Sequence, residues 1–490
     1  MARLLAAFVV TGLFFMALPG TVLGVWNLVG ISSERQLAGV PAAWIQAHGH
    51  AQFFGWVGTF IIGISLYALP KFRGAMCRSV PAGWAMWAMW SAGVGLRWIA
   101  GVAETARAWE FRAAAALELA VALLLLWQVT ARGPKYKGGQ VWELPIFAGF
   151  GALVTLLGWQ LLLTMGPLAA PALPAGPDRV FISIAIWGFA FPVVAGYCAK
   201  FFPGLVATGP GHAGAMRAAM ALAGLAAIAF AAEAETAGFA ASLAAVGLAS
   251  WSLRIWGETG RPKTAGVYRR YPEFARLAWA WLALSAVLGL GASRPGMLGA
   301  SRHAFTVGFL ATLIFSIGPR ILPSFLNSRE LWSARLMQVS LILVTAGCAL
   351  RVISEPLAYG SIVAPAWKTL PVSAFAELTA VLLFGFNLAM SLATPVPAWF
   401  GRRHVNDRMS VYWLVAAYPA TRRILVESGL RTLEHAREIP KSLTLREAAQ
   451  ADGIAPELLT ARLGDFFEAR LPRSQRQPLR TSESTRSTNQ

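Results

Sequence analysis

Charged residues are scarce in this 490-residue chain. Only 13% of the residues are Asp, Glu, Lys or Arg, 56% are hydrophobic, and the mean hydropathy is +0.55. So little charge cannot cover the surface of a water-soluble protein of this size, which excludes a soluble globular fold. Most of the chain must be solvated by lipid, and we expect an all-α, polytopic membrane helix bundle.

Cysteine is scarce too. The chain has three, Cys77, Cys198 and Cys348, and they are scattered without a C-x-x-C pair. Disulfide-stapled folds and cysteine metal sites need an even framework or close pairs. Both are therefore excluded.

Long apolar stretches are what the sequence has in abundance. About twelve can cross a bilayer, with centres near residues 15, 61, 93, 122, 156, 190, 225, 246, 282, 314, 344 and 385. The first continues through Gly20 to Trp26, which is too long for a signal-peptide core. We expect it to remain in the protein.

Basic residues sort into alternate loops. The segments near residues 71–78, 132–137 and 254–270 are basic, whereas the intervening loops hold acids such as Glu34 and Glu110. Because Lys and Arg in short loops stay in the cytoplasm, we expect both termini there. The net charge of +19 then reflects contact with anionic lipid and not with nucleic acid.

The composition changes from apolar to charged near residue 404. We expect a transmembrane bundle over residues 1–404, a small helical cytoplasmic domain over 405–471 and a disordered basic tail over 472–490. Thr444 and Glu447 have the spacing of a capping box, and Gly453 is a stop signal. The small domain resembles one found near iron-sulfur repair proteins, but it lacks cysteine, which favours protein interaction over a redox role.

One pattern occurs twice in the chain. A His-Ala pair is followed after three residues by Gly and, fourteen residues later, by Pro-x-Phe, once over 50–72 and again over 303–325. The motif Ala-Gly-x-x-Leu-Arg-x-Ile then brings Arg97 and Arg351. Because the chain has only six histidines, His50 and His303 at matched points of a repeat are expected to act as a pair.

A weaker third copy lies between these two. Gly188, fourteen further residues and Pro203 match the pattern, but Ser183 takes the place of the histidine. This copy cannot provide the same ligand.

The polar residues of the repeat are expected to meet in the outer third of the membrane. Each copy has a histidine at the outer end of an inward-running helix, an arginine late in the next helix and a glutamate early in the one after that. The residues placed there are His48, His50, Arg97, Glu118, Arg302, His303, Arg351 and Glu377.

Haem chemistry suits this arrangement. Neutral imidazole is a common ligand of haem iron, and two imidazoles from facing helices can clamp one porphyrin. We therefore expect a haem, of b type, with His50 and His303 as its axial ligands. Arg97 and Arg351 can pair with its propionates, and Arg302 is a further cofactor-binding candidate.

The two carboxylates, Glu118 and Glu377, can orient the ligand imidazoles or balance the arginines. A plainer interpretation stays open. The histidines can be helix-end residues in the headgroup region, and Arg97–Glu118 and Arg351–Glu377 can be ion pairs that lock neighbouring helices.

His48 lies two residues from His50, so on a regular helix the two face different ways. If the helix starts only after Gly49, His48 is free to cap a second metal site, for which copper is the candidate. His212, His404 and His435 are interpreted as ordinary surface residues.

These motifs resemble the NnrS family of bacterial membrane proteins over about residues 1 to 400. The matching blocks are His48-x-His50-x3-Phe54-Gly55 and His303-Ala304-x-Thr306-Val307-Gly308. The resemblance implies haem, copper, the bacterial inner membrane and a role in nitric oxide metabolism or nitrosative stress.

A more distant resemblance connects the chain to the catalytic subunit of haem-copper oxidases. There the low-spin haem is held by histidines of helices two and ten, which correspond to His50 and His303. The sixth helix departs from that pattern, because Phe191 stands where the family has a copper ligand in Trp187-x3-Phe191-Pro192. The resemblance thus implies a haem without the copper centre of oxygen or nitric oxide reduction.

Three functions follow from the sequence. The first is a haem-binding NnrS-type protein that acts with nitric oxide or a redox partner. The second is an oxidase or nitric oxide reductase core, and the third is a transporter with polar groups at mid-depth. The catalytic residues, and whether the protein is an enzyme, stay open.

Overall fold

The computed structural model describes residues 1–103, 108–166, 171–258, 271–326, 332–393 and 405–468, except 419, 435, 437–438 and 441–442. The described chain is all-α, as predicted, with one isolated bridge between Ser410 and Thr444. It divides into two compact units, the long helices up to α16 and the short helices from α18 onward. His404, His435 and the tail over 472–490 lie outside the described residues.

A helix covers each of the twelve expected positions. In chain order they are α1 (Ala2–Phe15) with α2 (Leu23–Glu34), α3 (Ala42–His50) with α4 (Thr59–Phe72), α5 (Val80–Val102), α6 (Ala108–Val129), α7 (Glu143–Met165), α8 (Ala175–Ile184) with α9 (Phe191–Leu205), α10 (Ala213–Ala231), α11 (Glu235–Leu253), α12 (Tyr271–Gly289), α13 (Met297–His303) with α14 (Thr312–Leu326), α15 (Ala334–Tyr359) and α16 (Ala366–Ala393).

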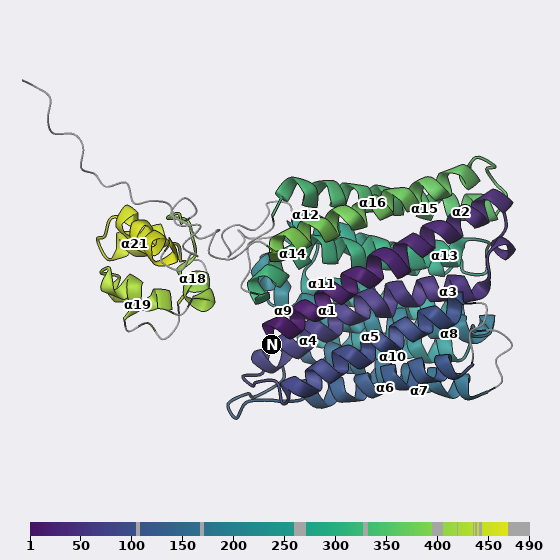
Figure 1. The fold of residues 1–490 in the computed structure, drawn as a ribbon, viewed down its shortest axis with the longest axis horizontal. Helices are drawn as coiled ribbons and strands as arrows, with labels where there is room; N and C mark the ends of the chain where they lie inside the picture. The colour runs from purple at the N-terminus through teal and green to yellow at the C-terminus, as the bar shows by residue number, and fades with distance from the viewer. Residues whose placement is uncertain are drawn as a thin grey trace, which may run out of the picture. The chain divides into compact units, whose positions relative to one another are not determined.

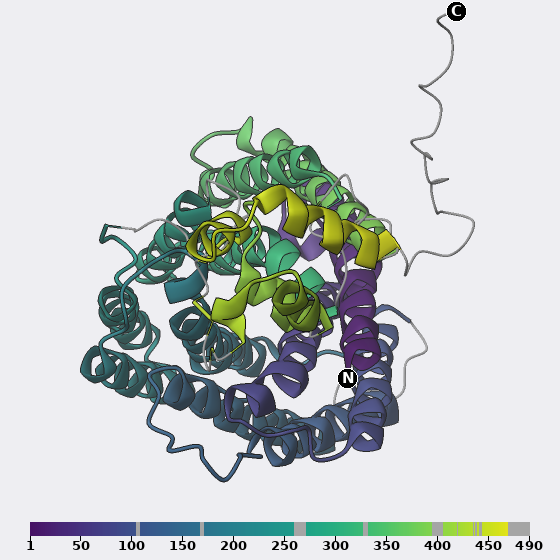
Figure 2. The same ribbon diagram turned by 90° about the vertical axis from the view of Figure 1, so that its left-hand side faces the viewer.

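Ten helices of the described chain are long and apolar enough to cross a membrane, and α5 and α12 are not among these ten. The chain is therefore a multi-pass membrane protein. Figure 1 shows the long helices lying side by side, and Figure 2 views them roughly along their axes. The N-terminal span reaches the last one, because Val25 and Leu28 of α2 share a buried cluster with Ala358 of α15 and Leu370 of α16.

Four of the spans contain a π-helical segment, whose hydrogen bonds run from residue i to i+5 and widen the helix. These are η1 (Met16–Val22), η3 (Ala51–Gly58), η4 (Ala185–Ala190) and η5 (Ala304–Ala311). Two of them start directly after His50 and His303, and η4 starts two residues after Ser183. The three copies of the sequence motif thus share a backbone irregularity of a kind that is frequent at functional sites.

The repeat also extends to the other end of the helices. Ser79 caps α5 and Ser333 caps α15, each with its hydroxyl accepting a hydrogen bond from the N–H three residues on. Gln128 of α6 bonds to both the N–H and the carbonyl of Ser79, at 3.2 and 2.6 Å. Asn387 of α16 does the same to Ser333, at 2.9 and 2.8 Å.

The third copy has a related pair of hydrogen bonds between two helix ends. The N–H of His212, at the start of α10, donates to the Ser252 carbonyl at 3.1 Å, and the Ser252 hydroxyl donates to the His212 carbonyl at 2.9 Å. The His212 imidazole accepts a bond from Arg254 in an exposed position, as expected of a surface residue. The weak sequence match of this copy therefore corresponds to a real structural copy without the histidine.

The three helices with the motif form the core of the bundle. Between 67% and 89% of the most apolar stretch of α3–α4, α8–α9 and α13–α14 is buried, against 56% or less in the other seven candidate spans. Bulky aromatic side chains fill the space between them, including Trp187, whose ring centroid lies 5.2 Å from that of Phe305. This packing keeps the three motif helices at the centre of the bundle.

The second unit contains α18 (Val411–Ala417), α19 (Ala420–Glu427), α20 (Leu445–Ala451) and α21 (Pro456–Glu468). Its core is built from apolar side chains that are almost fully buried, among them Leu425, Leu430, Leu445, Leu459 and Leu463. The predicted capping box between Thr444 and Glu447 forms at the start of α20, and Gly453 follows that helix at a φ of +69°. These short-range predictions are confirmed.

Candidate cofactor site

A partly open cavity of about 660 Å³ is lined by residues of α2, α3, α8 and α13, which Figure 1 labels at one end of the bundle. Its volume is within the range of ligand and cofactor sites in proteins. His48 and His50 of α3 and His303 of α13 all line it. The structure therefore brings the histidines of both sequence copies to one cavity, as the repeat predicts.

The charged lining of the cavity is predominantly basic. Five arginines and three carboxylates face it: Arg97, Arg179, Arg294, Arg302, Arg351, Asp178, Glu355 and Glu377. With these groups ionised, positive charge exceeds negative charge by two. The cavity is therefore suited to an anionic ligand with an apolar body.

Three arginines point to where such an anion would bind. Arg97 Nη1, Arg302 Nε and Arg351 Nη1 are buried atoms without a hydrogen-bond partner. A buried N–H without an acceptor costs about 1–3 kcal/mol, so native structures seldom retain one unless a ligand or water completes it. The sequence predicted all three as cofactor-binding residues, with Arg97 and Arg351 near the propionates.

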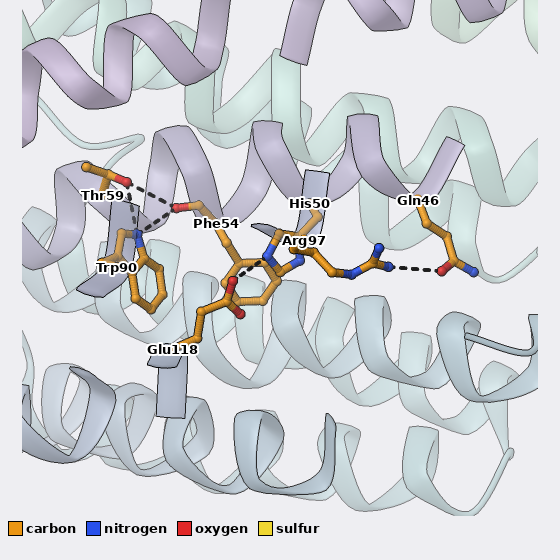
Figure 3. A network of polar contacts seen from close by, with 7 residues as sticks. All are labelled: Gln46, His50, Phe54, Thr59, Trp90, Arg97 and Glu118. Carbon is orange, nitrogen blue, oxygen red and sulfur yellow. Dashed lines mark hydrogen bonds and ion pairs between the residues drawn. The ribbon is translucent and has the colours of Figure 1, made fainter. Parts of the chain in front are cut away.

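The first copy contributes a hydrogen-bonded network, shown in Figure 3. His50 Nε2 lies 2.8 Å from Glu118 Oε1, with both side chains buried, and the imidazole stacks on Phe54 at 4.7 Å between ring centroids. Arg97 Nη2 donates to Gln46 Oε1 at 3.2 Å, and its guanidinium lies 3.7 Å from the centroid of the Phe111 ring. Glu118 therefore holds the His50 imidazole, and its role beside a haem ligand stays a prediction.

Gln46 is itself held in place. Its amide nitrogen donates to the Leu173 carbonyl at 2.8 Å, and its amide oxygen accepts from the Leu173 N–H at 2.8 Å. The same oxygen receives the bond from Arg97. The backbone of the segment before α8 thus fixes the amide that orients Arg97.

The second copy is arranged differently. Arg351 Nε lies 3.1 Å from Glu355 Oε2, one helical turn further along α15. Glu377 Oε1 is buried without a hydrogen-bond partner. Glu355 fits there because Gly299 of α13 has no side chain, since a Cβ at that position would overlap the Glu355 carboxylate.

These contacts correct the plainer interpretation of the arginines and glutamates. Neither Arg97–Glu118 nor Arg351–Glu377 forms an ion pair, although all four side chains are described. Glu118 turns toward α3 and pairs with His50. Arg351 pairs within its own helix, where the i, i+4 spacing brings the two groups onto one face.

A second metal site at His48 required the helix to start only after Gly49, and this requirement is not met. The helix α3 starts at Ala42, so His48 lies inside it, and its Nδ1 is 2.9 Å from the Gly20 carbonyl at the η1–α2 span. Among the described residues, no three His, Cys, Asp or Glu side chains are grouped so that they could hold a lone metal ion. Copper therefore stays a prediction without a recognisable site in the described chain.

Sequence reasoning missed several residues of the site. Asp178 and Arg179 of α8 face the cavity, as does Glu355, and Gln46 orients Arg97. Two of them had a readable signal, because Gln46 precedes His50 by four residues and Glu355 follows Arg351 by four. Either spacing places the pair on one helix face.

The three cysteines are free, as expected, and none of them lines the cavity.

A comparison with curated proteins finds no match. The model of a protein family described as "NnrS protein" matches residues 5–396, about four fifths of the sequence. On the strength of that match, the chain belongs to the NnrS family.

Proposed function

We propose that this protein binds haem in the cavity at the outer end of its bundle and serves in the bacterial response to nitric oxide. One observation supports the haem more than any other. Histidines from both copies and buried arginine donors without partners meet in a single cavity of cofactor size.

The residues fit a porphyrin in three respects. The imidazoles would hold the iron through nitrogen, and the arginines would bind the propionates. Phe53, Trp56, Phe181 and Val307 would offer apolar surface to the ring. When bound, a haem supplies a one-electron redox centre and an iron that can bind nitric oxide.

The chain's own residues would then set the properties of that centre. Arg97, Arg302 and Arg351 would bind and orient the carboxylates through the donors that now have no partner. The buried positive charge would favour the reduced state of a nearby redox centre. Glu118 would keep His50 in one orientation.

The link to nitric oxide rests on family membership. The NnrS match covers the bundle, residues 5–396, and does not reach the small C-terminal unit. We infer that the bundle carries the function of the family and that the C-terminal unit contributes protein interaction. Nitric oxide would be either a reactant or a signal in this account.

The cavity would open toward the outside of the inner membrane. It lies near the start of the long α3–α4 span, whereas Arg73 follows the other end of that span. The loop between α6 and α7, with Lys135 and Lys137, shares the basic end with Arg73. Since basic loops stay in the cytoplasm, the cavity would face the opposite side.

No specific observation favours an oxidase core or a transporter. An oxidase core needs a cluster of copper ligands, and none is found in the described part of the chain. A transporter of the rocking type needs its polar site at mid-depth. The polar groups described above gather toward one end of the bundle instead.

The test is an absorption spectrum of the purified protein with haem quantified per chain. We expect one haem in the wild type and reduced retention in Arg97→Gln. Arg78→Gln is the matched control, because Arg78 is exposed at the basic end and contacts no cavity residue. Haem-free wild type, purified from cells with ample haem, would rule out the proposal.

A further inference from the structure

His48 and His50 are separated by one residue on α3, and their imidazoles bond to different parts of the bundle. His48 Nδ1 lies 2.9 Å from the Gly20 carbonyl. A carbonyl oxygen only accepts hydrogen bonds, so Nδ1 must be the protonated nitrogen. In the neutral imidazole, Nε2 at the far tip of the ring then carries the free lone pair, and His48 is one of the residues that line the cavity.

The packing around His48 keeps the ring in this position. Gly24 of α2 lies against the imidazole so closely that a Cβ at that position would overlap the ring. The η1 segment, which contains Gly20, places the accepting carbonyl beside Nδ1. Two glycines of the N-terminal span therefore shape the seat of this side chain.

His303 faces the cavity from the other copy of the repeat. It ends α13 and lines the same cavity. Unlike His50, it forms no ion pair with a carboxylate of the described residues. Its imidazole is therefore not committed to a neighbouring acidic group.

His50 differs from both. Its far nitrogen, Nε2, is the one bonded to Glu118, so the free lone pair is on Nδ1, next to the residue's own Cβ. Phe54 stacks on the ring, with 28° between the planes. Because Nδ1 lies next to Cβ, the backbone of α3 would leave less room for a flat macrocycle there than at the tip of the ring.

From this geometry we propose that His48, together with His303, coordinates the haem iron, and that His50 is a positioning residue held by Glu118. The inference rests on the proposed haem function and deepens it. It departs from the repeat pattern in the sequence, which pairs His50 with His303. The repeat would set the positions of the helices, whereas the free ring nitrogen of each histidine would decide which imidazole binds the iron.

The experiment compares the absorption spectra of the wild type with those of His48→Ala, His50→Ala and His303→Ala at equal haem loading. We expect His48→Ala and His303→Ala to lose the low-spin bands, and imidazole added to His48→Ala to restore them. We expect His50→Ala to keep the low-spin bands. Loss of these bands in His50→Ala together with their persistence in His48→Ala would overturn the inference.

A second pair of variants tests the seat of His48 without removing a histidine. Gly24→Ala should displace the ring and reduce the low-spin fraction, as His48→Ala does. Gly95→Ala is the control, because no atom lies within 4 Å of the added Cβ. If Gly24→Ala and Gly95→Ala both keep a wild-type spectrum, His48 is not the ligand.

These results separate the two proposals. Wild type without haem removes the proposed function and this inference together. Wild type with a low-spin haem that survives His48→Ala removes only the inference and leaves haem binding in place.

Discussion

The Glu118 carboxylate accepts a hydrogen bond from His50 at 2.8 Å in the buried space between α3 and α6. The matched carboxylate of the second copy, Glu377, has an oxygen without a partner. The two halves of the repeat therefore share their helices and caps but differ in their polar contacts. This asymmetry gives each half a separate prediction.

Glu118→Ala should destabilise the bundle by about 1–3 kcal/mol, because it leaves the buried His50 imidazole without its acceptor. Thermal unfolding in detergent can be followed by labelling the buried thiols of Cys198 and Cys348, which become accessible on unfolding. Glu118→Gln retains an acceptor oxygen, so it should destabilise the bundle less than Glu118→Ala does. Equal midpoints for all three proteins would show that the bond contributes nothing.

Gln128→Ala tests the pair of hydrogen bonds between Gln128 and the Ser79 backbone at the basic end of the bundle. The substitution removes both bonds to the Ser79 backbone and leaves the Ser79 N–H without a partner, at a cost of about 1–3 kcal/mol. The Ser79 carbonyl keeps its bond from the Gly83 N–H. The same thiol-labelling assay measures this cost. Thr155→Ala, at an exposed site with one local bond, should leave the midpoint unchanged.

Arg97→Gln should lower the reduction potential of the bound haem. Removing a buried positive charge disfavours the state with one more electron, so the oxidised form gains stability. A spectroscopic redox titration of the loaded protein measures the shift. A potential that stays the same or rises would contradict a position of Arg97 near the haem.

The capping box in the C-terminal unit should make that unit sensitive to acid. Hydrogen bonds from the Thr444 N–H and hydroxyl, at 2.9 and 3.0 Å, lower the pKa of Glu447 below its ordinary value of 4.5. A group with a lowered folded pKa stabilises the fold above its unfolded pKa and loses that contribution as the pH falls through the folded value.

We therefore expect amide protection of α20 in the full chain to be complete above pH 5.5 or so and to weaken below pH 4.5. Thr444→Ala should reduce the protection at neutral pH by about 1 kcal/mol and flatten its pH dependence. Hydrogen exchange with peptide-level mass spectrometry measures both. Identical acid profiles for the two proteins would contradict the role of the box.

The orientation can be tested with single cysteines in a Cys77→Ser background. Lys137→Cys, at the basic end, should react with an impermeant thiol reagent only in inverted vesicles, and Arg35→Cys, at the cavity end, only in intact spheroplasts. Both positions are exposed, so access depends on sidedness. The reverse labelling pattern would place the cavity in the cytoplasm.

The sequence predicted the helices and the gathering of His50, His303, Arg97 and Arg351 at one end. The helices follow from the length of the apolar stretches, and the gathering follows from the repeated motif. Both patterns can be read from one sequence. Cap brackets such as Gln128 with Ser79 also leave a trace, since Asn387 occupies the equivalent place in the second copy.

The partners of individual side chains could not be predicted in the same way. Whether Glu118 reaches Arg97 or His50 depends on the rotation of α6, and the π segments change that register without a clear sequence signal. The direction of His48 depends on Gly20 and Gly24, which are far away in the chain and mark only a close approach of helices.

The most direct test of the account is the absorption spectrum of purified wild type in its oxidised and reduced states, measured beside His303→Ala. Whether the first iron ligand is His48 or His50, the second is His303 in this account. We predict one low-spin haem per chain in the wild type and loss of the low-spin bands in His303→Ala. A wild type without haem, or a His303→Ala protein with an unchanged low-spin spectrum, would contradict it.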